Sequence, residues 1–225
     1  MSGRITHTLV VATTNRGKLD EMRALLEGLP LELRTAAEVG AGPDKLTIVE
    51  DGATFEENAI KKARAVAQAT MTLTLADDSG LEVDALGGAP GVRSARFASE
   101  RATDAENNAA LLTRLEEIAG DSGDNAFPAR FRCVLALVDP YTGGSPHLAE
   151  GRCEGAVTRA PRGTGGFGYD PLFVVAGGER TMAELEGTEK NRISHRALAT
   201  IRMRPTLERL LLDRDEKIRK MFQGG

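Results

Sequence analysis

The sequence predicts an α/β protein with a mixed central sheet, flanking helices and two lobes around an active-site cleft. In the first half, short apolar runs typical of strands alternate with stretches whose apolar residues recur at helical spacing. In the second half, two long strand-like runs at 129–139 and 147–159 are joined by a Pro/Gly-rich loop, which indicates an antiparallel hairpin. We therefore expect one two-lobed domain over residues 1–225, with 211–225 as a helical C-terminal tail.

Composition limits the function classes. The 225 residues are 41% hydrophobic, enough for a real core, and the net charge of -4 gives no global attraction for nucleic acid or an anionic membrane. The longest apolar runs are far shorter than the roughly 20 residues of a membrane helix, and the first ten residues lack the apolar core of a signal peptide. We expect a cytoplasmic protein whose two cysteines, Cys133 and Cys153, are reduced strand residues.

The chain opens with a strand, a tight loop and a helix. A short apolar run at 8–13 leads into a polar loop, and apolar residues then recur at helical spacing. The loop consists of Thr13, Thr14, Asn15, Arg16, Gly17 and Lys18. Backbone N–H groups and the positive helix end would point at one place, as in a phosphate-binding loop. It is not a Walker A loop, because Ala12 replaces a required glycine and Leu19 replaces the Ser or Thr after the lysine. The alternative is that the loop only caps the helix and that Lys18 is a solvated surface residue.

The next elements are a weak strand and a well-marked helix. A strand is expected at 31–35, followed by a loop that carries Glu50 and Asp51. A capping-box pattern at 54–57 opens a helix with one apolar face. Its charged residues are expected to form a solvated face; they are Glu56, Glu57, Lys61, Lys62 and Arg64.

Two adjacent carboxylates form the central feature of the chain. Asp77 and Asp78 directly follow the apolar run 71–76, and Ser79-Gly80 follow them. Carboxylates at the end of a buried strand lie where ligands of open α/β sheets gather, so the pair is a candidate Mg²⁺ ligand or general base. The alternative is that Asp-Asp-Ser-Gly is simply a turn. The glycines around Pro90 then indicate a sharply bent loop.

The second half begins with a helix that a capping box at 103–106 should start. Its inward residues are expected to be Leu111, Leu112, Leu115 and Ile118. Ala119-Gly120 mark its end, and a polar loop at 121–125 follows.

A glycine-rich aromatic loop at 162–171 has the most unusual composition. Four glycines in six residues surround Phe167, and such a loop is costly to order unless its backbone passes close to a ligand. A flexible surface loop is the alternative. A helix-like stretch at 181–189 and the cluster Lys190 to Arg196 follow, and the remainder is expected to be helical with a break near Pro205.

Together these segments resemble the inosine triphosphate pyrophosphatase family, also described as XTP/dITP diphosphatases. The resemblance runs from about Leu9 to Leu210, with six motifs in one order. The motifs are Thr13-Thr-Asn-Arg-Gly-Lys18, Thr54-Phe-Glu-Glu-Asn-Ala59, Ala76-Asp-Asp-Ser-Gly-Leu-Glu-Val83, Gly87-Gly-Ala-Pro-Gly91, Gly165-Gly-Phe-Gly-Tyr-Asp-Pro171 and Ser194-His-Arg196. The resemblance implies a Mg²⁺-dependent homodimeric enzyme that hydrolyses ITP, dITP and XTP to monophosphate and pyrophosphate, cleansing the nucleotide pool.

The resemblance also implies roles for individual residues. Asp78 would be the catalytic base and a metal ligand, with Glu50, or its neighbour Asp51, as the second metal carboxylate. The loop from Thr13 to Lys18 would hold the triphosphate with Lys190. The nucleoside site would contain Ser79, Phe167, Gly168, Tyr169 and Asp170, with Phe167 stacked on the base and His195 and Arg196 reading its edge. The chain departs from the family pattern at Thr14, where many relatives carry Gly, and in its longer tail after about Leu211.

Two other functions compete with this one. A Maf-like pyrophosphatase would prefer pyrimidine or modified nucleotides such as dTTP or UTP. A non-catalytic nucleotide-binding module would bind triphosphates without Mg²⁺-dependent turnover, with the acidic pair serving only as a turn.

Overall fold

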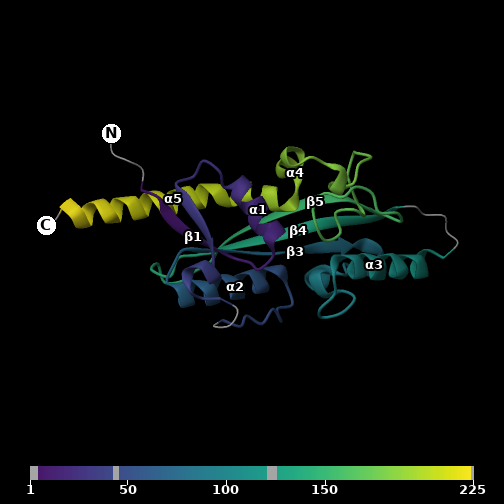
Figure 1. The fold of residues 1–225 in the computed structure, drawn as a ribbon, viewed down its shortest axis with the longest axis horizontal. Helices are drawn as coiled ribbons and strands as arrows, with labels where there is room; N and C mark the ends of the chain where they lie inside the picture. The colour runs from purple at the N-terminus through teal and green to yellow at the C-terminus, as the bar shows by residue number, and fades with distance from the viewer. Residues whose placement is uncertain (1–4, 43–45, 121–125, 224–225) are drawn as a thin grey trace.

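The computed structural model describes residues 5–42, 46–120 and 126–223, which form one six-stranded mixed sheet covered by helices on both faces (Figure 1). The sheet order is β2-β1-β3-β4-β5-β6. The strands are β1 His7–Ala12, β2 Leu31–Thr35, β3 Thr74–Val83, β4 Ala126–Val138, β5 His147–Thr158 and β6 Phe173–Val175. The helices are α1 Arg16–Leu25, α2 Phe55–Thr70, α3 Asp104–Ala119, α4 Gly187–Ile193 and α5 His195–Gln223. Short 3-10 helices are η1 Ala37–Val39, η2 Asp84–Leu86, η3 Gly91–Arg96 and η4 Met182–Glu184. The predicted fold class is confirmed.

The topology predicts a ligand crevice at the carboxyl end of β1. β1 pairs in parallel with β2 and β3, whereas the β3-β4, β4-β5 and β5-β6 pairs are antiparallel. Helix α1, which follows β1, lies on the same side as α5, and α2, which follows β2, lies on the opposite side (Figure 1). The chain thus leaves neighbouring strands toward opposite faces, the arrangement that opens a ligand crevice in α/β sheets. β1 ends at Ala12 opposite Ala76, while β3 continues beside β4 to Val83.

The core has three apolar clusters. One packs the β1-β3-β4 face against α1 and α5 and includes Leu9, Leu75, Leu135, Met22 and Leu207. A second packs the opposite face against α2 and includes Val10, Ala76, Val134, Ala59 and Ala63. The third lies at the far end of β3 and β4 and includes Leu81, Phe131, Leu111, Leu115 and Phe173. Because side chains alternate along a strand, neighbouring residues of β3 belong to different clusters.

Two elements extend further than the sequence predicts. Asp77 and Asp78 lie inside β3, not after it, because β4 continues to pair with this segment through Val83. The turn interpretation of Asp-Asp-Ser-Gly is therefore wrong. The predicted break at Pro205 is also wrong, since α5 is helical throughout His195–Gln223. Pro205 and Ile201, whose carbonyl loses its partner, are both exposed, so water can satisfy that carbonyl.

Helix faces and caps show smaller corrections. Ile118 is 54% exposed, because the buried stripe of α3 continues from Leu115 to Ala119 four residues on. The reciprocal capping box at Thr103 and Glu106 is confirmed. At the start of α2 only half of the predicted box forms, because the Glu57 carboxylate accepts from the Ala53 N–H instead of from Thr54. The predicted loop 121–125 lies outside the described residues.

The stretch at 181–189 is not one helix. Thr181 with Glu184 forms one capping pair and Glu186 with Glu189 forms another, so η4 and α4 begin separately, with an extended Leu185 between them. The second of these helices carries Lys190.

The C-terminal part of α5 projects beyond the sheet (Figure 1). It is attached to β1 by a hydrogen bond of 2.7 Å between His7 Nε2 and Asp215 Oδ1, and to the end of β4 by Arg214, which pairs with Asp139 at 2.9 Å. None of the helices in the described parts of the chain combines the length and apolar character needed to cross a bilayer.

Candidate functional site

The loop after β1 is held in a defined shape by its own side chains. Asn15 caps α1 by accepting the Lys18 N–H at 3.1 Å, and the Thr13 hydroxyl accepts the Asn15 N–H at 3.1 Å. Thr14 and Arg16 are exposed. The positive end of the α1 dipole therefore lies at the carboxyl end of β1, where an anion would be favoured.

Asp77 is the centre of a buried polar cluster on the α5 face of the sheet. Its carboxylate accepts from Lys18 Nζ at 2.5 Å, Arg196 Nε at 2.9 Å, the Ser79 hydroxyl at 2.9 Å and the Cys133 thiol at 3.0 Å. Burial alone would raise the pKa of Asp77, but the Arg196 and Lys18 charges hold that pKa well below its usual range. Asp77 is thus a permanent anion. The interpretation of Lys18 as a solvated surface residue is wrong, since its side chain is 17% exposed.

Asp78 points to the opposite face, toward α2. It accepts from Lys62 Nζ at 2.7 Å and from the Asn58 amide at 3.3 Å. Burial raises the pKa of Asp78, and Lys62 offsets only part of that effect. A carboxylate with a raised pKa is a stronger proton acceptor than Asp77 beside it, so the two neighbours differ in the way that separates a general base from a structural anion.

Lys62 corrects the sequence analysis, which placed it on the solvated face of α2. It is 7% exposed, and its ammonium also contacts Glu50 at 3.0 Å. The signal was available in the pattern, because Lys62 follows Ala59 by three residues and precedes Val66 by four, within the buried stripe. A lysine within the buried stripe of a helix needs a partner for its charge, and the structure supplies two, the Glu50 and Asp78 carboxylates.

Glu50 and Asp78 converge on one positive centre, the Lys62 ammonium, at 3.0 and 2.7 Å. Among the described residues no group of three or more His, Cys, Asp or Glu side chains could hold a metal ion. Two carboxylates nonetheless suit Mg²⁺, which usually keeps several waters and takes one or two carboxylates together with substrate phosphates. Asp51 instead pairs with Lys61 at 2.6 Å on the exposed side of the helix.

A chain of alternating charges connects the Asp77 cluster to the glycine-rich loop. Arg196 pairs with Glu21, Glu21 with Lys190 at 2.7 Å, and Lys190 with Asp170 at 2.6 Å. Arg196 is 1% exposed, and its carboxylate partners raise its pKa against the opposing effect of burial. Glu21 was not predicted, although its position three residues after Lys18 on α1 places it on the same helix face.

The Phe167 ring lies over this charge chain. Its centroid is 5.1 Å from Lys190 Nζ and 5.6 Å from Arg196 Cζ, and a Cβ at Gly17 would lie only 2.6 Å from the ring. The loop around it is also fixed. The Gly168 N–H donates to Asp104 at 2.7 Å, and the Tyr169 hydroxyl donates to the Ser94 carbonyl at 2.9 Å.

His195 is buried beside Arg196. Its ring stacks on Phe131 with centroids 4.8 Å apart, and within the described residues its Nδ1 has no hydrogen-bond partner. Burial and then the Arg196 charge hold the pKa of His195 well below its usual range, so the ring is neutral near pH 7. A neutral imidazole can either donate or accept a hydrogen bond.

The structure therefore brings most of the predicted residues together. Lys18, Asp77, Ser79, Phe167, Asp170, Lys190 and Arg196 are joined by contacts on one face of the sheet. Asp78 and Glu50 meet at Lys62 on the other. Tyr169 is 4% exposed and directs its hydroxyl away from this cluster, toward Ser94. The binding roles of these residues stay predictions.

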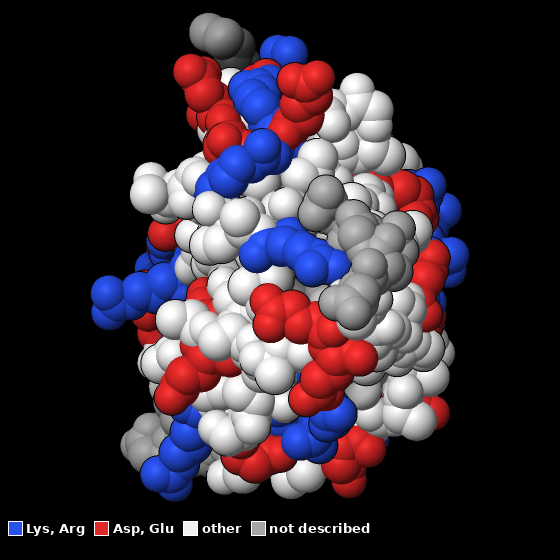
Figure 2. All heavy atoms as spheres, turned by 90° about the vertical axis from the view of Figure 1, so that its right-hand side faces the viewer, with Lys and Arg blue, Asp and Glu red and all other residues white. Residues whose placement is uncertain are grey.

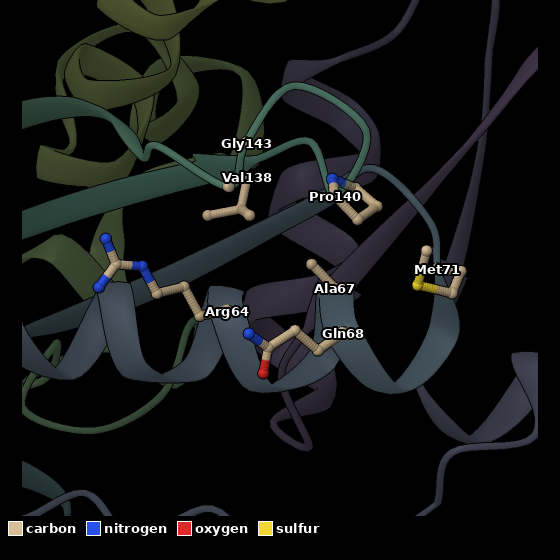
Figure 3. Close-up of a pocket in the computed structure, with 8 residues that line it drawn as sticks. Arg64, Ala67, Gln68, Met71, Val138, Pro140 and Gly143 are labelled. Carbon is tan, nitrogen blue, oxygen red and sulfur yellow. The ribbon is translucent and has the colours of Figure 1, made fainter.

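A separate cavity of about 440 Å³ lies between the end of α2 and the β4-β5 loop (Figure 3). Its lining residues are Arg64, Ala67, Gln68, Met71, Val138, Pro140, Gly143 and Gly144. None of the predicted site residues lines it, and it has no cluster of carboxylates, so the charge clusters at the β1 crevice are the better candidate.

Comparisons with known proteins agree with one another. A family model described as the Ham1 family matches residues 9–206. A dITP/XTP pyrophosphatase of Desulforamulus reducens is 49% identical over 207 residues, covering 92% of this chain and 98% of the relative. One of Geobacter sulfurreducens is 50% identical over 191 residues, covering 85% of this chain and 92% of the relative. A HAM1 protein structure from Coxiella burnetii aligns with a TM-score of 0.79 and 43% identity over 91% of this chain and 100% of that one.

Proposed function

Because the chain belongs to the Ham1 family, we propose that it hydrolyses non-standard purine nucleoside triphosphates such as ITP, dITP and XTP to the monophosphate and pyrophosphate. This reaction would cleanse the nucleotide pool. The observation that carries the proposal is the different surroundings of the two adjacent carboxylates. Asp77 is neutralised by Lys18 and Arg196, while Asp78 keeps a raised pKa beside Lys62 at the crevice.

The triphosphate would bind at the N-terminal end of α1. The loop from Thr13 to Lys18 supplies backbone N–H groups, a helix dipole and one lysine. Lys190, which pairs with Glu21 of α1, would be a second cation. Both lysines are paired with carboxylates in this structure, so an incoming phosphate would share their charge with Asp77 and with Asp170 and Glu21.

Attack of water at the α-phosphorus would follow from the position of Asp78. Its raised pKa makes it able to take the proton of a water molecule, and the Lys62 charge beside it would stabilise the negative charge that develops on the oxygens of the attacked phosphate. The bond between the α-phosphorus and the oxygen that bridges it to the β-phosphorus would break. Lys18 would then stabilise the negative charge of the departing pyrophosphate.

We propose that Asp78 and Glu50 hold Mg²⁺, because both carboxylates already reach one cation in this structure. When bound, the metal would withdraw charge from the phosphate oxygens and so reduce their repulsion of the nucleophile.

The base would be recognised at the other end of the crevice. Phe167 would stack on the purine, with Gly168, Tyr169, Asp170 and Ser79 around the nucleoside. His195 and Arg196 would donate to a 6-keto oxygen. An adenine amino group there would leave buried donors unpaired at about 1–3 kcal/mol each, so ITP and XTP should be preferred over ATP at least several-fold.

The surroundings in which the enzyme acts are part of the proposal. We place it in the cytoplasm, as a homodimer, with a small-molecule substrate and no nucleic-acid polymer or membrane as partner. Acidic and basic side chains are interspersed over the face drawn in Figure 2, unlike the basic tract that binds a nucleic-acid backbone. Light scattering on the purified protein measures its oligomeric state.

Product analysis is the experiment that tests the function. ITP, XTP, dITP, GTP, ATP and dTTP are incubated with and without Mg²⁺, and pyrophosphate is separated from orthophosphate. Pyrophosphate from the inosine and xanthosine substrates supports the proposal. Orthophosphate release or indifference to the base contradicts it, a preference for dTTP favours a Maf-like activity, and binding without turnover favours a non-catalytic module.

A further inference from the structure

The loop that carries Glu50 lies beside an open cavity. A cavity of about 510 Å³ separates the loop from η3 and is lined by Val49, Glu50, Asp51, Gly52, Val92, Arg93, Arg96 and Glu100. The described loop residues on either side of Glu50 have no helical or strand structure. The position of the Glu50 carboxylate therefore depends on the side chains that hold this loop.

Arg96 makes one such contact. Its guanidinium Nη2 donates to the Glu50 carbonyl at 2.7 Å, and its side chain is 24% exposed. Gly52, two residues further on, is held from the other side, where its N–H donates to the Asn58 amide oxygen at 2.8 Å. The loop is thus fixed from η3 and from α2.

The segment that carries Arg96 is itself fixed to β3. Ser94 accepts the Leu81 N–H at 2.9 Å and donates to the Gly91 carbonyl at 2.7 Å. A Cβ at Gly80 would lie 2.3 Å from the Ser94 hydroxyl, so η3 packs directly on the strand two residues from Asp78. Arg96 consequently connects the backbone of Glu50 to the strand of Asp78.

We propose that Arg96 is a positioning residue, which holds the backbone of Glu50 so that its carboxylate and that of Asp78 meet the same Mg²⁺. This inference rests on the proposed function and deepens it. Arg96 touches neither the metal nor the substrate, and it acts through the carbonyl of Glu50. Without it, the loop would sample positions in which Glu50 and Asp78 no longer converge on one centre. Outer contacts of this kind typically change metal affinity by about 10- to 100-fold.

The chain offers a matched control in Arg93. It lies on the same 3-10 helix, lines the same cavity and pairs with Glu100 at 2.9 Å, as Arg96 does more loosely at 3.9 Å. The structure gives Arg93 no hydrogen bond to Glu50 among the described residues. Arg93→Gln therefore removes a neighbouring charge and the Glu100 contact but keeps the Glu50 contact. Arg96→Lys keeps a donor and should restore part of the effect.

The test measures Mn²⁺ binding to the full-length variants by electron paramagnetic resonance. The measurements are made in the presence of an ITP analogue whose α and β phosphorus atoms are bridged by a methylene group. We expect Arg96→Gln to weaken Mn²⁺ binding about 10-fold, with an unchanged unfolding midpoint and unchanged metal-free binding of the analogue. The Mg²⁺ concentration for half-maximal turnover should rise in parallel, and kcat at saturating Mg²⁺ should recover. Arg93→Gln should behave like the wild type.

The possible failures can be told apart. If the wild type binds Mn²⁺ and Arg96→Gln binds it equally well, the positioning role is overturned while the proposed function stands. If Arg93→Gln weakens binding as much as Arg96→Gln, the effect is one of general charge and the positioning role is again overturned. If the wild type binds no Mn²⁺ with the analogue present, the metal part of the proposed function fails, and this inference fails with it.

Discussion

Asp77 and Asp78 are neighbours in β3, yet they bind cations on opposite faces of the sheet, Asp77 with Lys18 and Arg196 and Asp78 with Lys62. The alternation of side chains along a strand produces this separation. Asp77 therefore binds Lys18 and Arg196 on the face proposed to hold the nucleoside. Asp78 shares Lys62 with Glu50 on the other face.

Substituting each aspartate by asparagine should separate these roles. Asp78→Asn is expected to reduce turnover about 10³-fold, since it removes the proposed base. It should lower the free energy of unfolding less than Asp77→Asn does, because burial already disfavours the Asp78 charge and Lys62 keeps Glu50 as a partner. Asp77→Asn leaves buried Arg196 and Lys18 without their shared anion and should cost about 3 kcal/mol. Pyrophosphate release and urea unfolding measure the two effects. A fully active Asp78→Asn would reject the assignment.

Lys62 should be required for turnover, whereas its neighbour Lys61 should not. Lys62→Gln removes the positive charge between Glu50 and Asp78 and is expected to lower kcat/KM about 10²-fold. Lys61 is exposed and pairs with Asp51, so the kcat/KM of Lys61→Gln should stay within about two-fold of the wild-type value. Steady-state kinetics with ITP at saturating Mg²⁺ decide the matter, and equal losses in the two variants would count against a specific role.

A methyl group at Gly17 should disturb the Phe167 ring without unfolding the protein. A Cβ there would meet the ring at 2.6 Å, so Gly17→Ala should displace Phe167 and raise the KM for ITP. Alanine favours a helix over glycine by about 0.5–1 kcal/mol, which offsets part of the clash. Gly187→Ala is the control, because a Cβ at this first residue of α4 meets no described atom within 4 Å. An unchanged KM would show that the Phe167 position does not affect substrate binding.

Glu150 should make stability depend on pH in the acid range. Arg132 and Arg152 hold the pKa of Glu150 at about 2, below its ordinary value of 4.5. A lowered pKa gives stability that is present above the unfolded value and lost as the pH falls through the folded one. The free energy of unfolding of the wild type should thus exceed that of Glu150→Gln by about 1 kcal/mol at pH 7, after allowance for the partial exposure of Glu150. This difference should shrink between pH 4.5 and 2. Urea unfolding at several pH values measures it, and a constant difference would contradict it.

Local patterns accounted for much of the fold. The apolar runs and caps located β1 to β5 and most of the helices, whereas the three-residue strand β6 was not predicted. Errors arose where a neighbour overrode a local signal. Asp-Asp-Ser-Gly has turn chemistry, but pairing with β4 keeps it extended. Pro205 should stop a helix, but its position on the exposed side of α5 lets the helix continue.

The sequence by itself determined the family motifs, the alternating elements and most of the chemical groups at the site, because these depend on residue type and spacing along the chain. Only the tertiary structure decided which groups meet. It placed Lys62 between Glu50 and Asp78, inserted Glu21 between Lys190 and Arg196, and brought Arg96 to the Glu50 backbone. These contacts join residues up to 175 positions apart, and no local preference specifies them. They form because a buried charge is stable only beside a partner, and packing of the sheet and helices decides which partner is within reach.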